Sequence, residues 1–265
     1  MNRQLFFALA LTTLAFCFAI RAEDEVKPIK ALYITGGGYH DYAKLTPLLT
    51  KNIARFANVT FDVKTGEKDA LGAMKDPKLG EGYDVIVYNM CFQVQTDKKV
   101  PIDEDLMKNA MRVTEEGKPT LMIHCAMHCF RIGNDWAGCC GLTTKVHDGF
   151  KGFSTKKPSP DNPIVKFWPD EWKTAGDELY QNIKFPDDSK ALLTAYSIDS
   201  KKDHVVAWTH TYGKGPVFGT TLGHDMKTAA QDEYQHLLAN GILSVCGKLG
   251  DDGKPVKGYG GTDSK

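Results

Sequence analysis

The sequence lacks an excess of charge of either sign, because 33 lysine and arginine residues stand against 33 aspartate and glutamate residues. A large basic surface is therefore not indicated, and we expect no nucleic-acid partner. The sequence also lacks the composition of a collagen-like, coiled-coil or wholly disordered chain, since 42% of its residues are hydrophobic and 25% are charged. Beyond the N-terminal region, no segment is apolar over the roughly 20 residues that a membrane-spanning helix needs. These absences leave a globular protein with a packed core.

The longest apolar run lies at the N-terminus, over residues 5–20, behind the positive charge of Arg3. Ala22 follows the run, directly before acidic residues, and the run is short for a membrane-spanning helix. This pattern is typical of a secretory signal peptide, which we expect over residues 1–22. We therefore expect an exported protein, periplasmic or extracellular, with no membrane span once the signal is removed. A lipid anchor through Cys17 is the lesser alternative, because a bulky side chain precedes that cysteine.

Apolar segments alternate with amphipathic segments through the first half of the chain. Strands are expected over residues 31–34, 59–63, 83–88 and 119–123, and helices over 42–56 and 104–116. Near-continuous apolar strands separated by helices are typical of a parallel sheet that is covered on both faces. The sequence therefore predicts the α/β class.

The periodicity breaks over residues 130–185, which predicts a long insertion of loops and short strands. Loops of this length are usually functional. Regular structure resumes with strands expected at 191–196, 204–208 and 216–222, and a helix over 229–246. Residues 248–265 are polar and rich in glycine, so a mobile tail is expected there.

Three histidines each follow an expected strand: His40, His124 and His224. Ligands of open parallel sheets bind beyond the carboxyl ends of the strands, so we expect these side chains to meet at one edge. His147, in the insertion, is placed to fold over the same edge. Imidazole exchanges protons near neutral pH, and its neutral form ligates metals. A single histidine is more often an ordinary buried hydrogen bonder, but three at one edge favour a site.

His128 lies four residues after His124, and Cys125 and Cys129 have the same spacing. On a helix these two pairs lie on different faces, so one ion would not easily bind all four side chains. A divalent metal is therefore an alternative rather than the first interpretation, with packing at the edge as the simpler one. The candidate metal ligands are His40, His124, His128, His147 and His224.

Two other motifs resemble chemical sites. The glycines at 36–38 could present backbone N–H groups to an anion or a sugar hydroxyl. The final glycine of a G-x-G-x-x-G motif is missing, so no nucleotide cofactor is expected.

Cys125 follows a strand, where a nucleophile elbow would lie. Its neighbours His124 and Ala126 include no glycine, which argues against a cysteine nucleophile.

The cysteines beyond the signal segment can pair in an exported protein. They are Cys91, Cys125, Cys129, Cys139, Cys140 and Cys246. Cys125 and Cys129 on one helix would lie too far apart for a disulfide, and neighbouring Cys139 and Cys140 would need a strained ring. A bridge from Cys129 to Cys139 or Cys140 is therefore expected.

Six motifs follow one another in a characteristic order. They are Thr35-Gly36-Gly37 with His40, Ile123-His124, Asp177-Glu178-Leu179-Tyr180, Val206-Ala207-Trp208, Tyr212-Gly213-Lys214-Gly215 with Val217-Phe218, and Thr221-Leu222-Gly223-His224. As an ordered set they resemble the trehalose-utilisation, or ThuA-like, family. The resemblance places one ThuA-like domain over residues 28–247. Two features depart from the family pattern, namely Pro216 in place of a basic residue and the cysteine-rich stretch over 125–140.

The resemblance implies a class I glutamine amidotransferase-like fold, an α/β three-layer sandwich with a mostly parallel central sheet, without the amidotransferase Cys-His-Glu machinery. It implies a small carbohydrate ligand, namely trehalose or a related, including oxidised, disaccharide. Carried over by position, it implies the pocket residues His40, His124, His147, Glu178, Trp208, Tyr212 and His224. Of these we expect His124, His40 and His224 to be catalytic, and we expect the others, together with Gly37 of the glycine turn, to bind the ligand.

Three functions are compatible with this pattern. The first is an exported carbohydrate-active enzyme in which His124 is a general acid or base and Trp208 stacks on a sugar, although core packing is an equal interpretation of Trp208. The second is a metal-dependent hydrolase or isomerase that uses the histidines as ligands. The third is a non-catalytic sugar-binding or interaction module.

Overall fold

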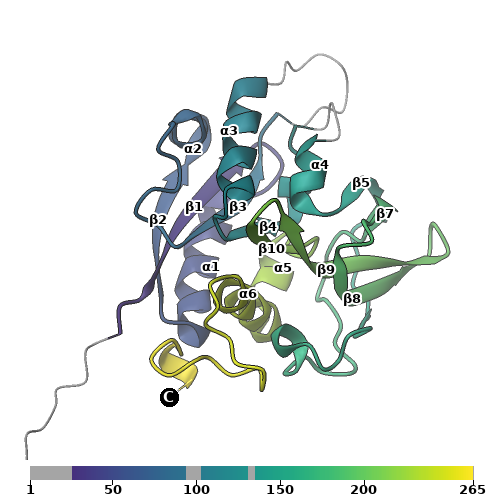
Figure 1. Ribbon diagram of the computed structural model, residues 1–265. Helices are drawn as coiled ribbons and strands as arrows, with labels where there is room; N and C mark the ends of the chain where they lie inside the picture. The colour runs from purple at the N-terminus through teal and green to yellow at the C-terminus, as the bar shows by residue number, and fades with distance from the viewer. Residues whose placement is uncertain (1–25, 94–102, 131–134, 265) are drawn as a thin grey trace, which may run out of the picture.

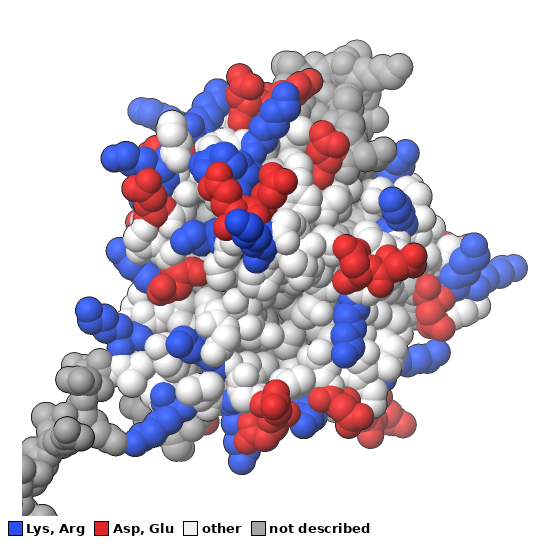
Figure 2. Space-filling model, viewed as in Figure 1, with Lys and Arg blue, Asp and Glu red and all other residues white. Residues whose placement is uncertain are grey.

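The computed structural model describes residues 26–93, 103–130 and 135–264. The expected signal peptide over 1–22, with Cys17, lies outside the described residues. No helix in the described part of the chain has both the length and the apolar character that a membrane crossing requires. Figure 2 shows lysine and arginine side chains interspersed with aspartate and glutamate over the face in view.

One large sheet of eight strands organises the described part of the chain (Figure 1). In spatial order its strands are β2 (Val59–Thr65), β1 (Ile29–Gly37), β3 (Val85–Cys91), β4 (Thr120–Ile123), β10 (Gly215–Thr220), β9 (Lys202–Tyr212), β8 (Lys190–Ser197) and β6 (Thr155–Lys156). Neighbours from β2 to β10 are parallel, and β9, β8 and β6 continue the sheet in antiparallel pairs. The predicted α/β class with a mostly parallel sheet is confirmed.

Helices cover both faces of this sheet. They are α1 (Tyr42–Phe56), α2 (Gly66–Lys75), α3 (Glu104–Glu115), α4 (Asp135–Cys140), α5 (Met226–Ala229) and α6 (Asp232–Val245). Asp41 begins α1 by accepting a hydrogen bond from the backbone N–H of Lys44, and Asp225 begins α5 by accepting one from the backbone N–H of Lys227. The helix expected over 229–246 is thus α6, with the short α5 before it.

The pleat of β1 shows why the molecule has three layers. Successive side chains of a strand point to opposite faces. Tyr33 packs in one apolar cluster with Leu49 of α1 and Leu238 of α6. Ile34 packs in a second cluster, with Met111 of α3. The sheet is therefore buried between α1 and α6 on one side and α2, α3 and α4 on the other (Figure 1).

The insertion over 130–185 contains short elements, as expected. Besides α4 and β6, it forms β5 (Thr143–His147), the 3₁₀ turn η2 (Pro163–Val165) and β7 (Tyr180–Lys184). β5 and β7 pair antiparallel as a separate two-stranded sheet, with His147 opposite Tyr180. This small sheet brings residues from both ends of the insertion together.

The segment after Gly247, for which a mobile tail is expected, makes specific contacts with the domain. The structure packs residues 248–264 against α1 and the loop that follows it, and the last turn is η3 (Thr262–Ser264). Arg55 Nε donates to Asp263 at 2.9 Å, and the Asn58 N–H donates to the carbonyl of Tyr259 at 2.8 Å. Specific partners on the domain therefore outweigh the polar, glycine-rich composition.

The expected disulfide pairing is also wrong. Cys91 and Cys125 are bonded, with their Cα atoms 5.3 Å apart, whereas Cys129, Cys139 and Cys140 are buried and not disulfide-bonded. Cys91 ends β3, and Cys125 lies in the 3₁₀ turn η1 (His124–His128) that follows β4. Because β3 and β4 are neighbouring strands, their ends bring these two cysteines together.

We predict that Gly219→Ala lowers the free energy of unfolding by about 1–3 kcal/mol, because overpacking strains a dense core. Gly219 lies opposite Trp208 on β9, and a Cβ at Gly219 would lie 2.2 Å from the indole ring. Trp208 is fully buried, so its ring has little room to move. The matched control is Gly72→Ala in α2, where a Cβ meets open space. Denaturant unfolding that shows equal stability for both variants would contradict this account.

Candidate functional site

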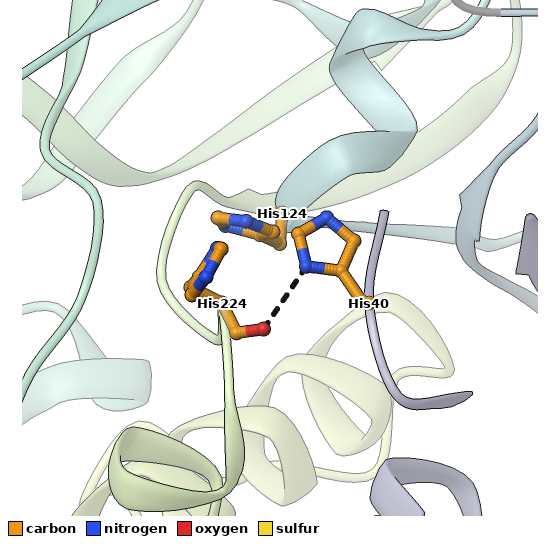
Figure 3. Close-up of side chains that lie close together, drawn as sticks. All are labelled: His40, His124 and His224. Carbon is orange, nitrogen blue, oxygen red and sulfur yellow. Dashed lines mark hydrogen bonds between the residues drawn. The ribbon is translucent and has the colours of Figure 1, made fainter. Parts of the chain in front are cut away.

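Three histidines meet at the carboxyl edge of the parallel strands. His40 follows β1, His124 follows β4 and His224 follows β10. Their ring centroids lie 4.8 Å apart for His40 and His124, 4.9 Å for His40 and His224, and 5.4 Å for His124 and His224 (Figure 3). Parallel strands end on the same side of the sheet, which is why residues so far apart in sequence converge here.

His124 occupies a strained turn between β4 and η1. Its φ is 49°, in the left-handed region that residues other than glycine rarely adopt. A strained residue between a strand and a helix is the geometry of a nucleophile elbow. The structure places an imidazole at this position, and the neighbouring Cys125 is bonded to Cys91.

The tautomer of His124 follows from its contacts. Nδ1 lies 2.6 Å from the carbonyl oxygen of Thr221, and a carbonyl can only accept, so Nδ1 carries the proton of the neutral ring. Nε2 then presents a lone pair. It lies 3.3 Å from the Tyr180 hydroxyl and 3.6 Å from a Glu178 carboxylate oxygen. The His124 side chain is only 2% exposed, so it lies beneath the more exposed Glu178 side chain and has little contact with solvent.

His40 is held as a neutral imidazole. Its Nδ1 donates to the carbonyl oxygen of His224 at 3.0 Å (Figure 3), which leaves the lone pair on Nε2. Burial, reinforced by repulsion from His124 and His224, lowers the pKa of His40 to about 3. No described residue gives the buried Nε2 atom a hydrogen-bond partner.

Glu178 is the only described carboxylate paired with these histidines. One of its oxygens lies 3.1 Å from His224 Nδ1 and 3.6 Å from His124 Nε2, and the other lies 3.6 Å from His147 Nε2. The contact with His224 has the distance of an ion pair but not the angles of a hydrogen bond.

Glu178 and His224 each shift the pKa of the other toward its charged form. Burial acts to raise the pKa of Glu178, but its contacts with the protonated forms of His124 and His224 outweigh burial and hold that pKa below its usual range. In turn, the polar contact with Glu178 raises the pKa of His224. The site therefore pairs an ionised carboxylate with an imidazole that holds its proton more firmly than usual.

Asp177 positions Glu178. Its buried carboxylate accepts hydrogen bonds from the backbone N–H groups of Gly223 at 2.8 Å, His224 at 3.2 Å and Glu178 at 2.8 Å. Gly223 adopts a φ of 110°, which suits glycine. This one carboxylate joins the insertion to the loop after β10.

A cavity of about 400 Å³ opens beside these groups, within the usual size range of small-molecule sites. Its wall includes Tyr39, Lys145, Glu178, Tyr180 and the Cys91–Cys125 disulfide, together with four of the histidines. Those histidines are His40, His128, His147 and His224. His128 stacks on Tyr180 with ring centroids 4.3 Å apart, so this candidate metal ligand forms part of the wall.

The structure places three of the expected ligand-binding residues outside the cavity wall. Trp208 is fully buried in the core, and its Nε1 donates to the carbonyl of Cys140 at 2.9 Å, so it cannot stack on a sugar. Tyr212 lies at the far end of β9, where it pairs with Gly215. Gly37 pairs with Cys91 at the end of β1, and its φ of 114° allows the close approach of the two strands.

Sequence reasoning missed Asp177 and Tyr180 as site residues, although both belong to the motif that contains Glu178. Glu178 and Tyr180 are two residues apart at the start of β7, and residues with this spacing share one face of an extended segment. That spacing is the signal that could have identified Tyr180.

His40, His124 and His224 also fit a metal ion in their donor chemistry. One ligand atom from each lies within 4.8 Å of the others. The Nδ1 atoms of His40 and His124 both donate to backbone carbonyls, an arrangement that usually accompanies metal-ligating histidines. Glu178 stands next to the group as an oxygen donor.

We predict that Asp177→Asn loosens the loop carrying His224, because an amide nitrogen would then face a buried backbone N–H. Leaving one such group unpaired costs about 1–3 kcal/mol. Hydrogen exchange should therefore accelerate at the amides of Gly223 and His224. Asp251→Asn, the same change at an exposed position, should leave that exchange unchanged. Unaltered protection in Asp177→Asn would contradict the positioning role.

Comparison with known proteins agrees with this architecture. A solved ThuA-like protein from Parabacteroides merdae has a TM-score of 0.66 and 22% identity, covering 90% of this chain and 99% of its own. A ThuA-like protein from Bacteroides uniformis has a TM-score of 0.64 and 14% identity, covering 84% and 95%. A Thermoplasma acidophilum protein described as one of the subunits of GMP synthase has a TM-score of 0.54 and 12% identity, covering 83% and 94%.

These likenesses show the fold alone, and that fold agrees with the expected glutamine amidotransferase-like architecture. A search of curated proteins found no match to the chain. The family model named ThuA, described as trehalose utilisation, matches residues 30–244, nearly the whole described domain. The chain therefore belongs to the ThuA family.

Proposed function

We propose that this protein is an exported carbohydrate-utilisation enzyme that binds trehalose or a related, including oxidised, disaccharide and transfers protons on it. The observation that carries this proposal is the position of Glu178, whose carboxylate contacts three imidazoles beside the cavity. Family membership supports the substrate class.

Proton transfer is supported by the unequal environments of the two groups that face the cavity. The lowered pKa of Glu178 keeps its carboxylate ionised and the raised pKa of His224 favours its protonated form, so each group has the protonation state that proton transfer requires. A sugar carbonyl makes the neighbouring C–H acidic, and an adjacent carboxylate and imidazolium suit its removal. His124, which lies beneath them, is a positioning residue in this proposal rather than the general acid or base expected from sequence.

A sugar also fits the wall of the cavity. Lys145, His147 and Glu178 offer charged and polar groups to hydroxyls. Tyr39 is 58% exposed at the cavity wall, so its ring is available to stack on a sugar face. Tyr39 thus takes the stacking role that was expected of Trp208.

Export is supported by two features. The N-terminal residues have the pattern of a signal peptide. The Cys91–Cys125 disulfide suits an oxidising compartment.

We predict that calorimetry detects binding of trehalose, maltose, their 3-keto forms or a simple glucoside. For the ligand that is turned over, Glu178→Gln should reduce turnover by at least ~100-fold, the usual effect of losing a general base. Glu171→Gln, the same change at an exposed position, is the matched control.

Absence of binding to every one of these sugars, with the fold intact, would contradict the carbohydrate proposal. Binding without turnover would favour the non-catalytic sugar-binding module instead. In that case Glu178→Gln should change the affinity alone.

A metal-dependent hydrolase or isomerase is the second candidate, favoured by the grouping of His40, His124 and His224. A metal at this position would supply Lewis-acid chemistry to a sugar carbonyl or hydroxyl. In this alternative the three imidazoles bind the ion, and Glu178 holds or moves the substrate proton.

For this second candidate we predict about one equivalent of zinc, manganese or nickel in untagged protein, measured by elemental analysis. His124→Ala should remove the metal, whereas His236→Gln should not, because His236 stacks between Phe56 and Phe167 outside the cavity wall. Protein with no stoichiometric metal and no thermal shift with these ions would eliminate the candidate.

A further inference from the structure

A second group of potential metal ligands lies in the wall of the same cavity. It comprises His40, Cys91 and Cys125, and one ligand atom from each lies within 4.8 Å of the others. Cys91 ends β3, Cys125 lies in η1, and His40 precedes α1, so three separate elements contribute. Both cysteines line the cavity although their residues are only 3% and 4% exposed. A small ion or reductant can therefore reach the sulfur atoms from the cavity.

His40 has the features of a ligand in this group. Its Nδ1 donates to the carbonyl oxygen of His224, which fixes the ring and leaves the lone pair on Nε2 (Figure 3). Nε2 is buried, and the described residues offer it no hydrogen-bond partner. Buried polar atoms in native proteins are usually satisfied, so an orphaned lone pair calls for an explanation such as an ion. A histidine that donates its other nitrogen to a carbonyl is typical of metal sites.

We propose that His40, Cys91 and Cys125 form a redox-gated site for a thiophilic divalent cation such as zinc. In the oxidised protein the two sulfur atoms are bonded to each other and the site is closed. In the reduced protein two thiolates and one imidazole provide three ligands, and the fourth position of a tetrahedral ion faces the cavity. Soft thiolate ligands select zinc over magnesium or calcium.

Opening the site requires two electrons. With a water-soluble phosphine, phosphorus supplies the electron pair and the S–S bond breaks. Water provides the oxygen of the phosphine oxide and the two protons of the thiols. A dithiol achieves the same result by exchange and leaves as its own disulfide. Binding of the cation as a bis-thiolate complex then releases the two thiol protons.

His40 belongs both to this group and to the cluster with His124 and His224, so the two arrangements compete for one side chain. They differ in chemistry, because only the group with Cys91 and Cys125 contains sulfur. The proposal is independent of the carbohydrate function and can be tested without a sugar.

The test is a Co²⁺ titration of the full chain in two states, oxidised and phosphine-reduced, followed by the charge-transfer absorption that Co²⁺ gives only with thiolate ligands. We expect the reduced protein to bind about one equivalent with this absorption, as a single site requires, and Zn²⁺ to erase it. The oxidised protein should lack it. Ion binding by imidazoles alone produces no such band, so the second candidate function cannot mimic the result.

Variants then identify the ligands. Cys91→Ser and Cys125→Ser should each lose the band. His40→Asn should weaken Co²⁺ binding by about tenfold or more, because losing even an outer partner of a ligand usually costs about 10–100-fold in affinity. The matched controls are Cys139→Ser and Cys129→Ser, because neither cysteine takes part in the disulfide. Both controls should keep the band. Loss of the disulfide can destabilise a serine variant, but the two states of the unaltered protein test the proposal without substitution.

Three results would overturn the proposal. The first is equal absorption in oxidised and reduced protein, which would assign binding to other thiols. The second is a band that survives Cys125→Ser or disappears in Cys129→Ser. The third is reduced protein that gives no thiolate absorption at saturating Co²⁺.

Discussion

The candidate site depends on the hydrogen bonds that the buried carboxylate of Asp177 accepts. They join two segments that are distant in sequence, namely the insertion and the loop after β10. Asp177 accepts hydrogen bonds from the backbone of Gly223 and His224, after β10, while its own backbone belongs to the insertion. The parallel sheet brings three imidazoles to one edge, but it does not provide the carboxylate. Glu178 comes from the insertion, and its backbone N–H donates to the same Asp177 carboxylate, which helps to hold it beside them. The rigid sheet and the irregular insertion thus contribute different halves of one site.

Environment gives the imidazoles of this cluster different properties. His40 is buried beside other potential positive charges, so its pKa falls to about 3 and it stays neutral. His224 contacts Glu178, which raises its pKa. A neutral imidazole can bind a metal ion through its lone pair, whereas a protonated imidazole can donate a proton. His224 cannot hold a proton and an ion on the same nitrogen, so the two proposed chemistries make opposite demands on it.

The sequence was informative where a rule of strand direction or periodicity applied. Periodicity predicted the α/β class, and the position of His40, His124 and His224 after strands predicted their convergence. It was uninformative where three-dimensional neighbours decide. Helix α2 escaped notice because it buries only two side chains, Ala70 and Met74. The pairing of Cys91 with Cys125 follows from the neighbouring strands β3 and β4, and the order of strands in space cannot be read from spacing. The choice between core packing and ligand stacking for Trp208, and the contacts of the C-terminal segment, could not be predicted from the sequence for the same reason, since partners distant in the chain fix both.

The left-handed backbone at His124 has a consequence for how this fold can change its chemistry. The sharp turn after β4 is a property of the main chain, and it directs whichever side chain stands there toward the loops after β1 and β10. An imidazole at the apex offers a lone pair, whereas a thiol or a hydroxyl would offer a nucleophile. A protein with this backbone can therefore change its reactivity through the residue at the position of His124 alone, without a change in the strands and loops around it.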